Sequence, residues 1–339
     1  MSDPVPMVEV WRGQFLECTH LGHAVACNVS GDIVRAWGDP DAVILPRSSC
    51  KMVQALPLVE SGAAQAFGLT SEHLALACAS HDGGVMHVDR VERWLTTLGL
   101  SDDALRCGRQ TPHDPSERTR LVKTDSHPSQ AHNNCSGKHS GFLTLNRHLK
   151  GDADYIAPSH PVQRAVRLAF EETTQQETPG FGIDGCSAPN FACTLRGLAQ
   201  AMAAFATAVK DMSAGTRAQA MRKLFEAMVE HPELVAGANR ACTRLMRAME
   251  GRVAVKTGAQ GVFVAIVPEH RLGVALKIVD GATRASECVI ATILAQLGVL
   301  DERHPVARSY LAAPTVNWRG ISTGLVTASP LLRQAEGSA

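Results

Sequence analysis

Two short segments, far apart in the chain, each carry a lysine whose amine could activate a serine hydroxyl. In the first, Ser48 and Lys51 follow the extended Leu45-Pro46 and precede a helical pattern. On a helix this spacing puts both side chains on one face. A lysine whose pKa is lowered by burial can accept a serine proton, and the positive end of a helix favours a developing oxyanion. The spacing indicates a Ser–Lys dyad, although a serine cap followed by a surface lysine has the same spacing.

The second segment, Lys256-Thr257-Gly258, strengthens the first. An early Ser-x-x-Lys with a late Lys-Thr-Gly on a strand is the motif pair of serine β-lactamases and penicillin-binding proteins. In those proteins the strand presents a second lysine and backbone groups beside the nucleophile. Ser80 supplies a second hydroxyl, which we expect to pair with Lys256. The Ser-Asp-Asn motif of an ordinary β-lactamase is missing in its literal form, which argues against that activity.

Two cysteines stand in loops of similar character. Cys135 and Lys138 lie at the start of a predicted helix, and Cys186 follows Asp184 in a glycine-rich loop at 182–190. A positive setting lowers the pKa of a thiol. The two cysteines could form a disulfide, bind a metal or supply a nucleophile, and a tetrahedral zinc site would need four ligands and a deprotonated lysine. Four histidines lack metal-site spacing and are expected in solvated loops: His127, His132, His139 and His160.

The periodicity of apolar residues places these segments on elements. Strand patterns cover 7–38 and return as a hairpin at 262–279, and residues 74–79 form an apolar run typical of a strand or a buried segment. Helical patterns are predicted from residue 51 to about 68, and at about 86–99, 136–149, 160–175, 191–211, 215–230, 238–250 and 283–298.

The order of these elements predicts the architecture. Strands at both ends of the chain, with helices between them, favour one antiparallel sheet built from both termini and a helical lobe inserted in the middle, an α/β sandwich. We expect one catalytic unit spanning 1–339. Its α/β lobe would comprise approximately residues 1–70 and 250–330, and its mainly helical lobe approximately 71–249.

Composition narrows the class of partner. The chain has 339 residues, 45% of them hydrophobic, and a formal net charge of zero. No basic surface therefore points to nucleic acid or to an anionic membrane, and a small-molecule substrate is expected. There is no apolar run long enough to span a bilayer and no secretory signal pattern. The ten irregularly spaced cysteines then indicate reduced thiols and a cytoplasmic protein.

Taken in order, five motifs resemble the asparaginase II family of rhizobial type over about residues 8–330. They are LPRSSCK, ASHDGG, HNNCSGKHSGFL, GIDGCSAPNFA and VAVKTGAQGVF. The resemblance implies a serine β-lactamase/glutaminase-like fold and a homodimer. It also implies an L-asparaginase that hydrolyses the side-chain amide of L-asparagine to L-aspartate and ammonia.

The resemblance also implies roles for single residues. Ser48 with Lys51, and Ser80 with Lys256, would be two catalytic dyads. A zinc ion would be held by Cys135, Lys138 and Cys186, with water completing its shell, and Asp184 would orient that water or the Lys138 amine. The expected substrate-binding residues are Arg47, His81, Asp184 and Gly258, of which Arg47 would meet the α-carboxylate.

Two other functions stay open at this point. A glutaminase or another β-lactamase-like serine acyl hydrolase would use the same scaffold. A non-catalytic amino-acid or zinc sensor would keep the fold without turnover, but it would have no need for two lysine proton acceptors, and both are present in the motifs.

Overall fold

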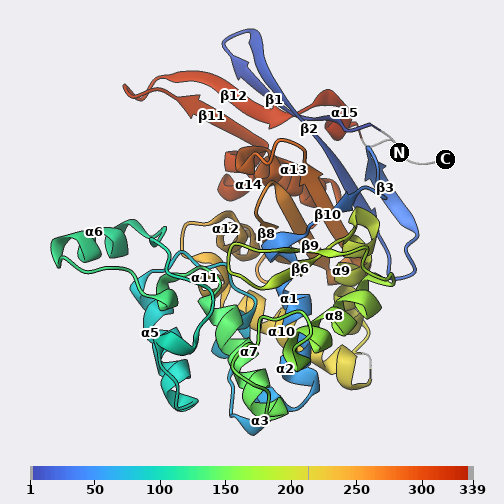
Figure 1. The fold of residues 1–339 in the computed structure, drawn as a ribbon. Coiled ribbons are helices and arrows are strands. Elements are labelled where there is room, and N and C mark those ends of the chain that lie inside the picture. Colours follow the sequence, from blue (N-terminus) through green and yellow to red (C-terminus); the bar gives the residue numbers. More distant parts are fainter. Residues whose placement is uncertain (1–2, 213, 335–339) are drawn as a thin grey trace. The chain divides into compact units, whose positions relative to one another are not determined.

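The computed structural model describes residues 3–212 and 214–334, which form two compact units. The sheet unit comprises segments 1–49, 193–210 and 244–339, and the helical unit comprises segments 50–192 and 211–243. Figure 1 colours both along the sequence. Each unit is assembled from chain segments that are distant in sequence.

The sheet unit is built on one antiparallel sheet, ordered β11-β12-β1-β2-β10-β9-β8, with β3 also paired to β2. Val8 lies opposite Ala328, and Cys27 lies opposite Gly273. Figure 1 shows the blue β1 beside the red β12. The prediction that both chain ends share a sheet is confirmed. Its strands are β1 (Val5–Arg12), β2 (Phe15–Cys27), β3 (Ile33–Trp37), β8 (Ala254–Gly258), β9 (Val262–Val267), β10 (Leu272–Ile278), β11 (Ala312–Val316) and β12 (Ser322–Ala328).

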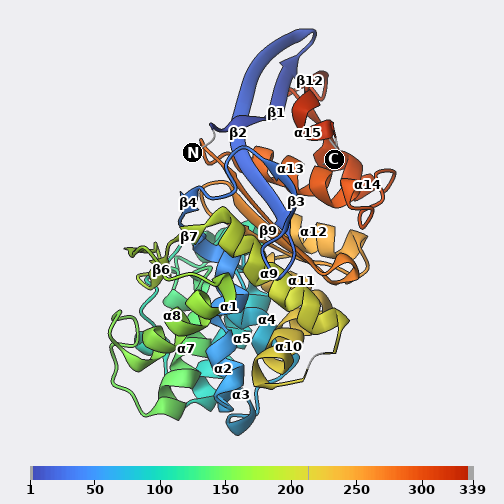
Figure 2. The same cartoon turned by 90° about the vertical axis from the view of Figure 1, so that its right-hand side faces the viewer.

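Helices cover the centre of this sheet. All six residues of β9 are buried, so both faces of the strand are covered. The helices α9 (Leu195–Lys210) and α13 (Thr283–Gln296) contact it and the neighbouring β10. The sequence analysis grouped α9 with the helical lobe, whereas here it packs on the sheet (Figure 2). The short helices α14 (Pro305–Leu311) and α15 (Pro330–Arg333) and the ribbon of β4 (Val43–Ile44) with β7 (Cys193–Thr194) complete the unit.

The helical unit is organised around α7 (Ser136–Leu149). Every residue of α7 from Ser136 to Asn146 is buried, and its range is the predicted one. Around it lie α1 (Lys51–Gln54), α2 (Leu56–Glu60), α3 (Ala63–Ala66), α4 (Ser71–Ala77), α5 (Val85–Thr97), α6 (Pro115–Lys123), α8 (Pro161–Thr174), α10 (Thr216–Glu230) and α11 (Pro232–Ala236). A hairpin of β5 (Phe181–Ile183) and β6 (Pro189–Phe191) belongs to the same unit, and α12 (Ala241–Ala248) leads back to the sheet unit.

One local prediction was wrong in detail, and another, the buried segment at 74–79, is confirmed as a helix and not as a strand. The helix expected from residue 51 to about 68 is three short helices, because Pro57 starts a new helix and Gly62 adopts a left-handed φ of 82°. The apolar run at 74–79 belongs mostly to α4, which the side chains of Thr70 and His73 cap. A helix buried on several sides has no polar face, and its sequence therefore resembles a buried strand.

None of the helices in the described part of the chain has the length and apolarity needed to cross a bilayer.

Candidate functional site

Lys51 is fully buried in the helical unit, and its amine lies among four acceptor atoms. Nζ donates to the carbonyl oxygen of Ala79, lies 3.1 Å from Ser80 Oγ, 3.4 Å from the carbonyl oxygen of Asn134 and 3.2 Å from Cys135 Sγ. The structure thus brings Ser80 to the amine of Lys51. The sequence analysis had assigned Lys51 to Ser48.

This arrangement suits both protonation states of the Lys51 amine. As an ammonium it has three N–H donors for the surrounding oxygens. As a neutral amine it keeps two N–H groups for the carbonyls of Ala79 and Asn134, and its lone pair is left to accept the proton of Ser80. The contact is therefore chemically competent for proton transfer between a serine and a lysine.

A close helix contact brings these acceptors together. A Cβ at Gly137, in the first turn of α7, would lie 2.3 Å from the carbonyl oxygen of Leu76 in α4, so only glycine fits there. The segment after α4 then runs beside the segment before α7, where the His81 amide donates to the carbonyl of Asn134 over 3.3 Å. The Ser80 amide donates to the carbonyl of Val235 over 2.8 Å. The Ser80 backbone is fixed on both sides.

His81 is fully buried behind Ser80. Its Nδ1 accepts from the Gly83 amide, so Nε2 carries the proton and donates to Ser136 Oγ over 2.9 Å. Burial lowers the pKa of His81, and the nearby His87, whose ring stacks on it at 4.7 Å, lowers it further. His81 is therefore a neutral ring with both nitrogens engaged in hydrogen bonds.

The predicted metal ligands also converge. Lys138 Nζ lies 3.1 Å from Cys186 Sγ, and the Cys135 thiol hydrogen-bonds to the same sulfur. That hydrogen bond lowers the pKa of Cys186 far below its usual value, with help from the Lys138 charge, and raises the pKa of Cys135. Burial alone would lower the pKa of Lys138, but the interaction with Cys186 outweighs it and the pKa is raised. The cluster is a buried thiolate–ammonium pair with a neutral thiol.

His139 and Tyr155 support this cluster, and the sequence analysis missed both. His132, His139 and His160 are buried, so the expectation of solvated loops was wrong for these three. Tyr155 accepts from the Arg106 amide over 2.9 Å and lies 2.8 Å from His139 Nδ1, to which it donates. The Nε2 of His139 then carries a proton and interacts with Cys186. The signal was the position of His139 in the first turns of α7, whose residues from Ser136 to Asn146 are all buried.

Asp184 and Cys186 lie in the loop between β5 and β6. The Asp184 carboxylate accepts from the Gly185 amide over 2.7 Å, and its charge adds to the raised pKa of Lys138. The carboxylate is half-buried, whereas Cys186 is buried. The short hairpin therefore places a negative charge beside the amine of Lys138.

The donor set of this cluster fits a soft divalent metal. Thiolate sulfur is a good ligand of zinc, and the lowered pKa of Cys186 favours that form. Cys135 and Lys138 hold protons, which they would have to lose before binding a cation. Two sulfurs and one amine leave a fourth tetrahedral position for another donor.

In the sheet unit, Ser48 lies in a 3₁₀ turn, Arg47–Cys50, instead of at the start of an α-helix. Arg47 begins that turn with a left-handed φ of 54°. The neighbouring Ser49 is fully buried and its hydroxyl donates to the carbonyl of Pro46 over 2.7 Å. Ser48 is half-buried. Of the two adjacent serines, Ser48 is the one accessible to a substrate.

The strand β8 ends against the same turn. A Cβ on Gly258 would lie 2.6 Å from the carbonyl oxygen of Pro46 and 3.2 Å from the Ser49 nitrogen, so the missing side chain allows this approach. Two residues earlier, Lys256 is fully buried and donates to the carbonyl of Thr257 over 2.9 Å. The sheet unit therefore brings the turn that carries Ser48 to the Lys-Thr-Gly strand, as the motif pair predicted.

Comparisons with known proteins give one family and several remote structures. The family model of L-asparaginase II matches residues 8–328. No curated protein matches the chain. Among solved structures, the native form of Mglu has 13% identity and a TM-score of 0.43 and covers 82% of this chain, which spans 64% of the length of Mglu.

Two further solved structures have other names. A β-lactamase from Mycobacterium bovis has 12% identity and a TM-score of 0.39, covering 81% of this chain and 94% of its own. The octameric penicillin-binding protein homologue from Pyrococcus abyssi has 11% identity and a TM-score of 0.33, covering 88% and 80%. These scores are low, so the fold of this chain is defined by the order of its own strands.

The charge on Cys186 can be tested by the ultraviolet absorbance of thiolate in metal-free protein. Because its pKa is lowered, we expect a thiolate band at neutral pH that is lost only when the pH falls well below the ordinary thiol pKa of about 8.5. Cys186→Ser should remove the band. Lys138→Met should shift its titration to higher pH, because the neighbouring positive charge is gone.

Cys288→Ser is the matched control. Burial raises the pKa of Cys288 to about 12, so this thiol is protonated at neutral pH and its loss should leave the band unchanged. A band that survives in Cys186→Ser would contradict the assignment.

Proposed function

This chain belongs to the L-asparaginase II family, and on that premise we propose that it hydrolyses the side-chain amide of L-asparagine to L-aspartate and ammonia. The observation that carries the proposal is the buried Lys51 amine, which is 3.1 Å from Ser80 Oγ and has two carbonyl acceptors. A binding protein has no need for a serine and a lysine in that geometry. An amide hydrolase needs both a nucleophile and a proton acceptor.

In the first half of the proposed reaction, the Ser48 hydroxyl attacks the amide carbon of asparagine. Lys51, three residues along the chain, takes the hydroxyl proton, and the carbonyl oxygen becomes an oxyanion. Backbone N–H groups of the turn Arg47–Cys50 are the proposed donors to that oxyanion, a type of contact worth about 3 kcal/mol per donor. As the nitrogen takes up a proton and leaves as ammonia, the C–N bond breaks and an acyl-enzyme ester remains.

Ser80 is proposed to carry the proton that the leaving nitrogen needs. The leaving nitrogen must gain a proton to depart as ammonia, and Ser80 is suited to pass one from Lys51, since the two side chains are in hydrogen-bond contact. Lys256 is proposed to act with Ser80 in this relay. Water then attacks the ester, gives a proton back to the lysine and releases aspartate, and the serine hydroxyl is restored.

The remaining roles concern placement of the substrate. We assign the α-carboxylate of asparagine to Arg47, whose left-handed backbone starts the turn that carries Ser48. His81 and Gly258 act through the backbone. His81 is held in the hydrogen bonds that fix the segment after Ser80, and Gly258 lets β8 approach the turn. Asp184 adds negative charge beside Lys138.

We also propose that Cys135, Cys186 and Lys138 bind zinc. When bound, the metal would supply positive charge that polarises a carbonyl oxygen and helps to place the substrate. The residues themselves do three things without it: Cys186 carries the negative charge, Lys138 neutralises it, and Cys135 connects the pair to the Lys51 amine. The cytoplasmic location expected from the sequence stays a prediction.

A homodimer is the proposed assembly. The sheet unit exposes large apolar side chains on two neighbouring hairpins, β1–β2 and β11–β12, which pair through β1 and β12 (Figure 1). Phe15 is 71% exposed and Trp318 is 106% exposed. Apolar side chains gathered in this way are typical of a protein–protein contact, and a second copy would cover them.

Serine variants test the mechanism. Ser48→Ala and Ser80→Ala should each abolish ammonia release from asparagine, because one removes the proposed nucleophile and the other the proton relay, while circular dichroism shows the fold intact. Ser49→Ala should keep most of the activity, since its hydroxyl serves the Pro46 carbonyl. Near-normal turnover in Ser48→Ala or Ser80→Ala would remove that serine from the mechanism.

The same protein distinguishes the substrates. Turnover of asparagine should exceed that of glutamine and of the β-lactam nitrocefin measured side by side. Acid quenching during turnover, followed by peptide mass analysis, should find the acyl group on the peptide that contains Ser48. An acyl group on Ser80 would exchange the two roles, and absence of turnover on all three amides would favour a sensor.

Metal binding should be linked to proton release. Cys135 and Lys138 have raised pKa values and Cys186 a lowered one, so zinc binding should displace about two protons. The affinity, measured in competition with a chromophoric chelator, should therefore rise about 100-fold per pH unit near neutrality. In Lys138→Met only about one proton is displaced, and the slope should fall to about tenfold. A pH-independent affinity would rule out this ligand set.

Sedimentation velocity tests the assembly. Trp318→Lys should shift a dimer toward monomer, because it places a charge in the proposed contact. Val122→Lys, at a residue that is 77% exposed on α6, is the matched control and should leave the dimer unchanged. A monomeric unmodified chain would overturn the proposed assembly.

A further inference from the structure

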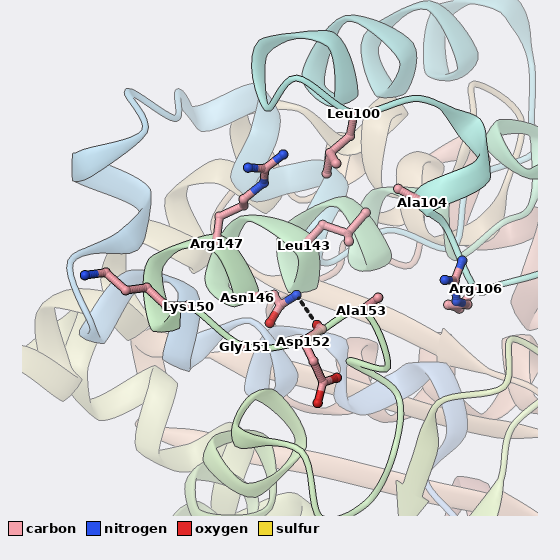
Figure 3. Close-up of a pocket in the computed structure, with 10 residues that line it drawn as sticks. All are labelled: Leu100, Ala104, Arg106, Leu143, Asn146, Arg147, Lys150, Gly151, Asp152 and Ala153. Atoms are coloured by element: carbon pink, nitrogen blue, oxygen red, sulfur yellow. Dashed lines mark hydrogen bonds between the residues drawn. The ribbon is translucent and has the colours of Figure 1, made fainter.

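A cleft lies in the helical unit, over the C-terminal half of α7, and contains none of the residues assigned to asparagine hydrolysis. Its volume is about 470 Å³, within the range of small-molecule sites in proteins. We call it the α7 cleft. It is lined by Leu100, Ala104, Arg106, Leu143, Asn146, Arg147, Lys150, Gly151, Asp152 and Ala153 (Figure 3).

The α7 cleft carries an excess of positive charge. Arg106, Arg147 and Lys150 line it, against one carboxylate, Asp152. Figure 3 shows Arg147 extending toward Leu100, Arg106 at the other end beyond Ala104, and the carboxylate of Asp152 pointing away from Leu143. Arg147 and Lys150 form no ion pair within the described ranges 3–212 and 214–334. An anion in the cleft would therefore meet cations that no carboxylate already neutralises.

The cleft also contains a buried acceptor without a partner. Asn146 is 8% exposed, and its Nδ2 donates to the carbonyl of Asp152 over 2.7 Å. Its Oδ1 is buried and has no hydrogen-bond partner among the described residues. A buried amide oxygen without a donor is costly, so a ligand that brings an N–H or O–H group to this position gains a hydrogen bond.

The rest of the wall is apolar. Leu100, Leu143, Ala104 and Ala153 line the same space. Cations near the C-terminus of α7 also offset its helix dipole, and this could account for Arg147 and Lys150 alone. It does not explain the cavity, the apolar wall or the unpartnered Asn146 oxygen. These four features together match the usual composition of a small-ligand pocket.

We propose that the α7 cleft binds a small organic anion: a carboxylate that pairs with Arg147 or Arg106, an apolar body against Leu100 and Leu143, and one N–H or O–H group donated to Asn146. This site is separate from the proposed hydrolytic site and does not depend on the asparaginase assignment. Because α7 carries Lys138 and His139 at its other end, the two sites share one helix.

The test uses the full chain and isothermal titration calorimetry with N-acetyl-L-leucine, which has the carboxylate, the apolar body and one amide N–H. We expect saturable binding at one site per chain. The uncharged N-methylamide of the same compound should bind at least about tenfold more weakly, because it has lost the charge. Acetate and inorganic phosphate test for a site that binds any anion.

Arg147→Gln should weaken binding of N-acetyl-L-leucine about tenfold and leave asparagine turnover unchanged. Lys123→Gln, an exposed cation on α6, is the matched control and should change neither. Leu100→Ala should weaken the leucine derivative but not acetate. Ser80→Ala should bind the probe normally, and L-aspartate should not compete with it, because the probe occupies a separate site.

Three results would overturn the proposal. One is absence of saturable binding of N-acetyl-L-leucine. Another is equal affinity in Arg147→Gln and the unmodified chain, which would place the probe elsewhere. The last is equal affinity for acetate, phosphate and N-acetyl-L-leucine, which would reduce the cleft to a general anion patch.

Discussion

The arrangement of the helical unit depends on one buried polar group, the Lys51 amine. An amine removed from water requires hydrogen-bond partners around it, and here they come from the segment after α4 and the segment before α7. The carbonyls of Ala79 and Asn134 can reach the amine only because Gly137 lets the two helices approach. Ser80 and Cys135 are carried to the amine by the same two segments. The hydrogen-bonding requirement of one buried amine is therefore met by the segments that carry the reactive groups.

The Lys138 cluster satisfies its charge in a different way. Lys138 is paired with an ionised sulfur, whereas Lys51 is surrounded mainly by neutral dipoles. The two lysines are connected through Cys135, whose sulfur accepts from Lys51 and interacts with Cys186, the partner of Lys138. A change in the charge of Cys186 would therefore be felt at Lys51 through a single thiol. In this way a cation held at the cysteines would influence the serine–lysine contact without touching it.

Features that depend on interactions between residues close in sequence were predicted from the sequence. The range of α7 and the hairpin of β9 and β10 followed from apolar periodicity, and the Lys-Thr-Gly strand was found from its motif. What depends on packing was not readable. The contact of Lys51 with Ser80 joins residues 29 positions apart, and nothing in their local sequence specifies it. His139 was misjudged because its polar neighbours suggested a loop, whereas the part of α7 that carries it, Ser136 to Asn146, is buried.

The pairing of β1 with β12 has a consequence for biosynthesis. Val8 and Ala328 are opposite each other in the sheet, so β1 has no partner on that edge until β12 has been synthesised. Most of the helical unit comes from the continuous segment 50–192, which can fold while translation continues. Contacts so distant in sequence are slow to form. Until β12 is made, the unpaired edge of β1 is open to pairing with another chain.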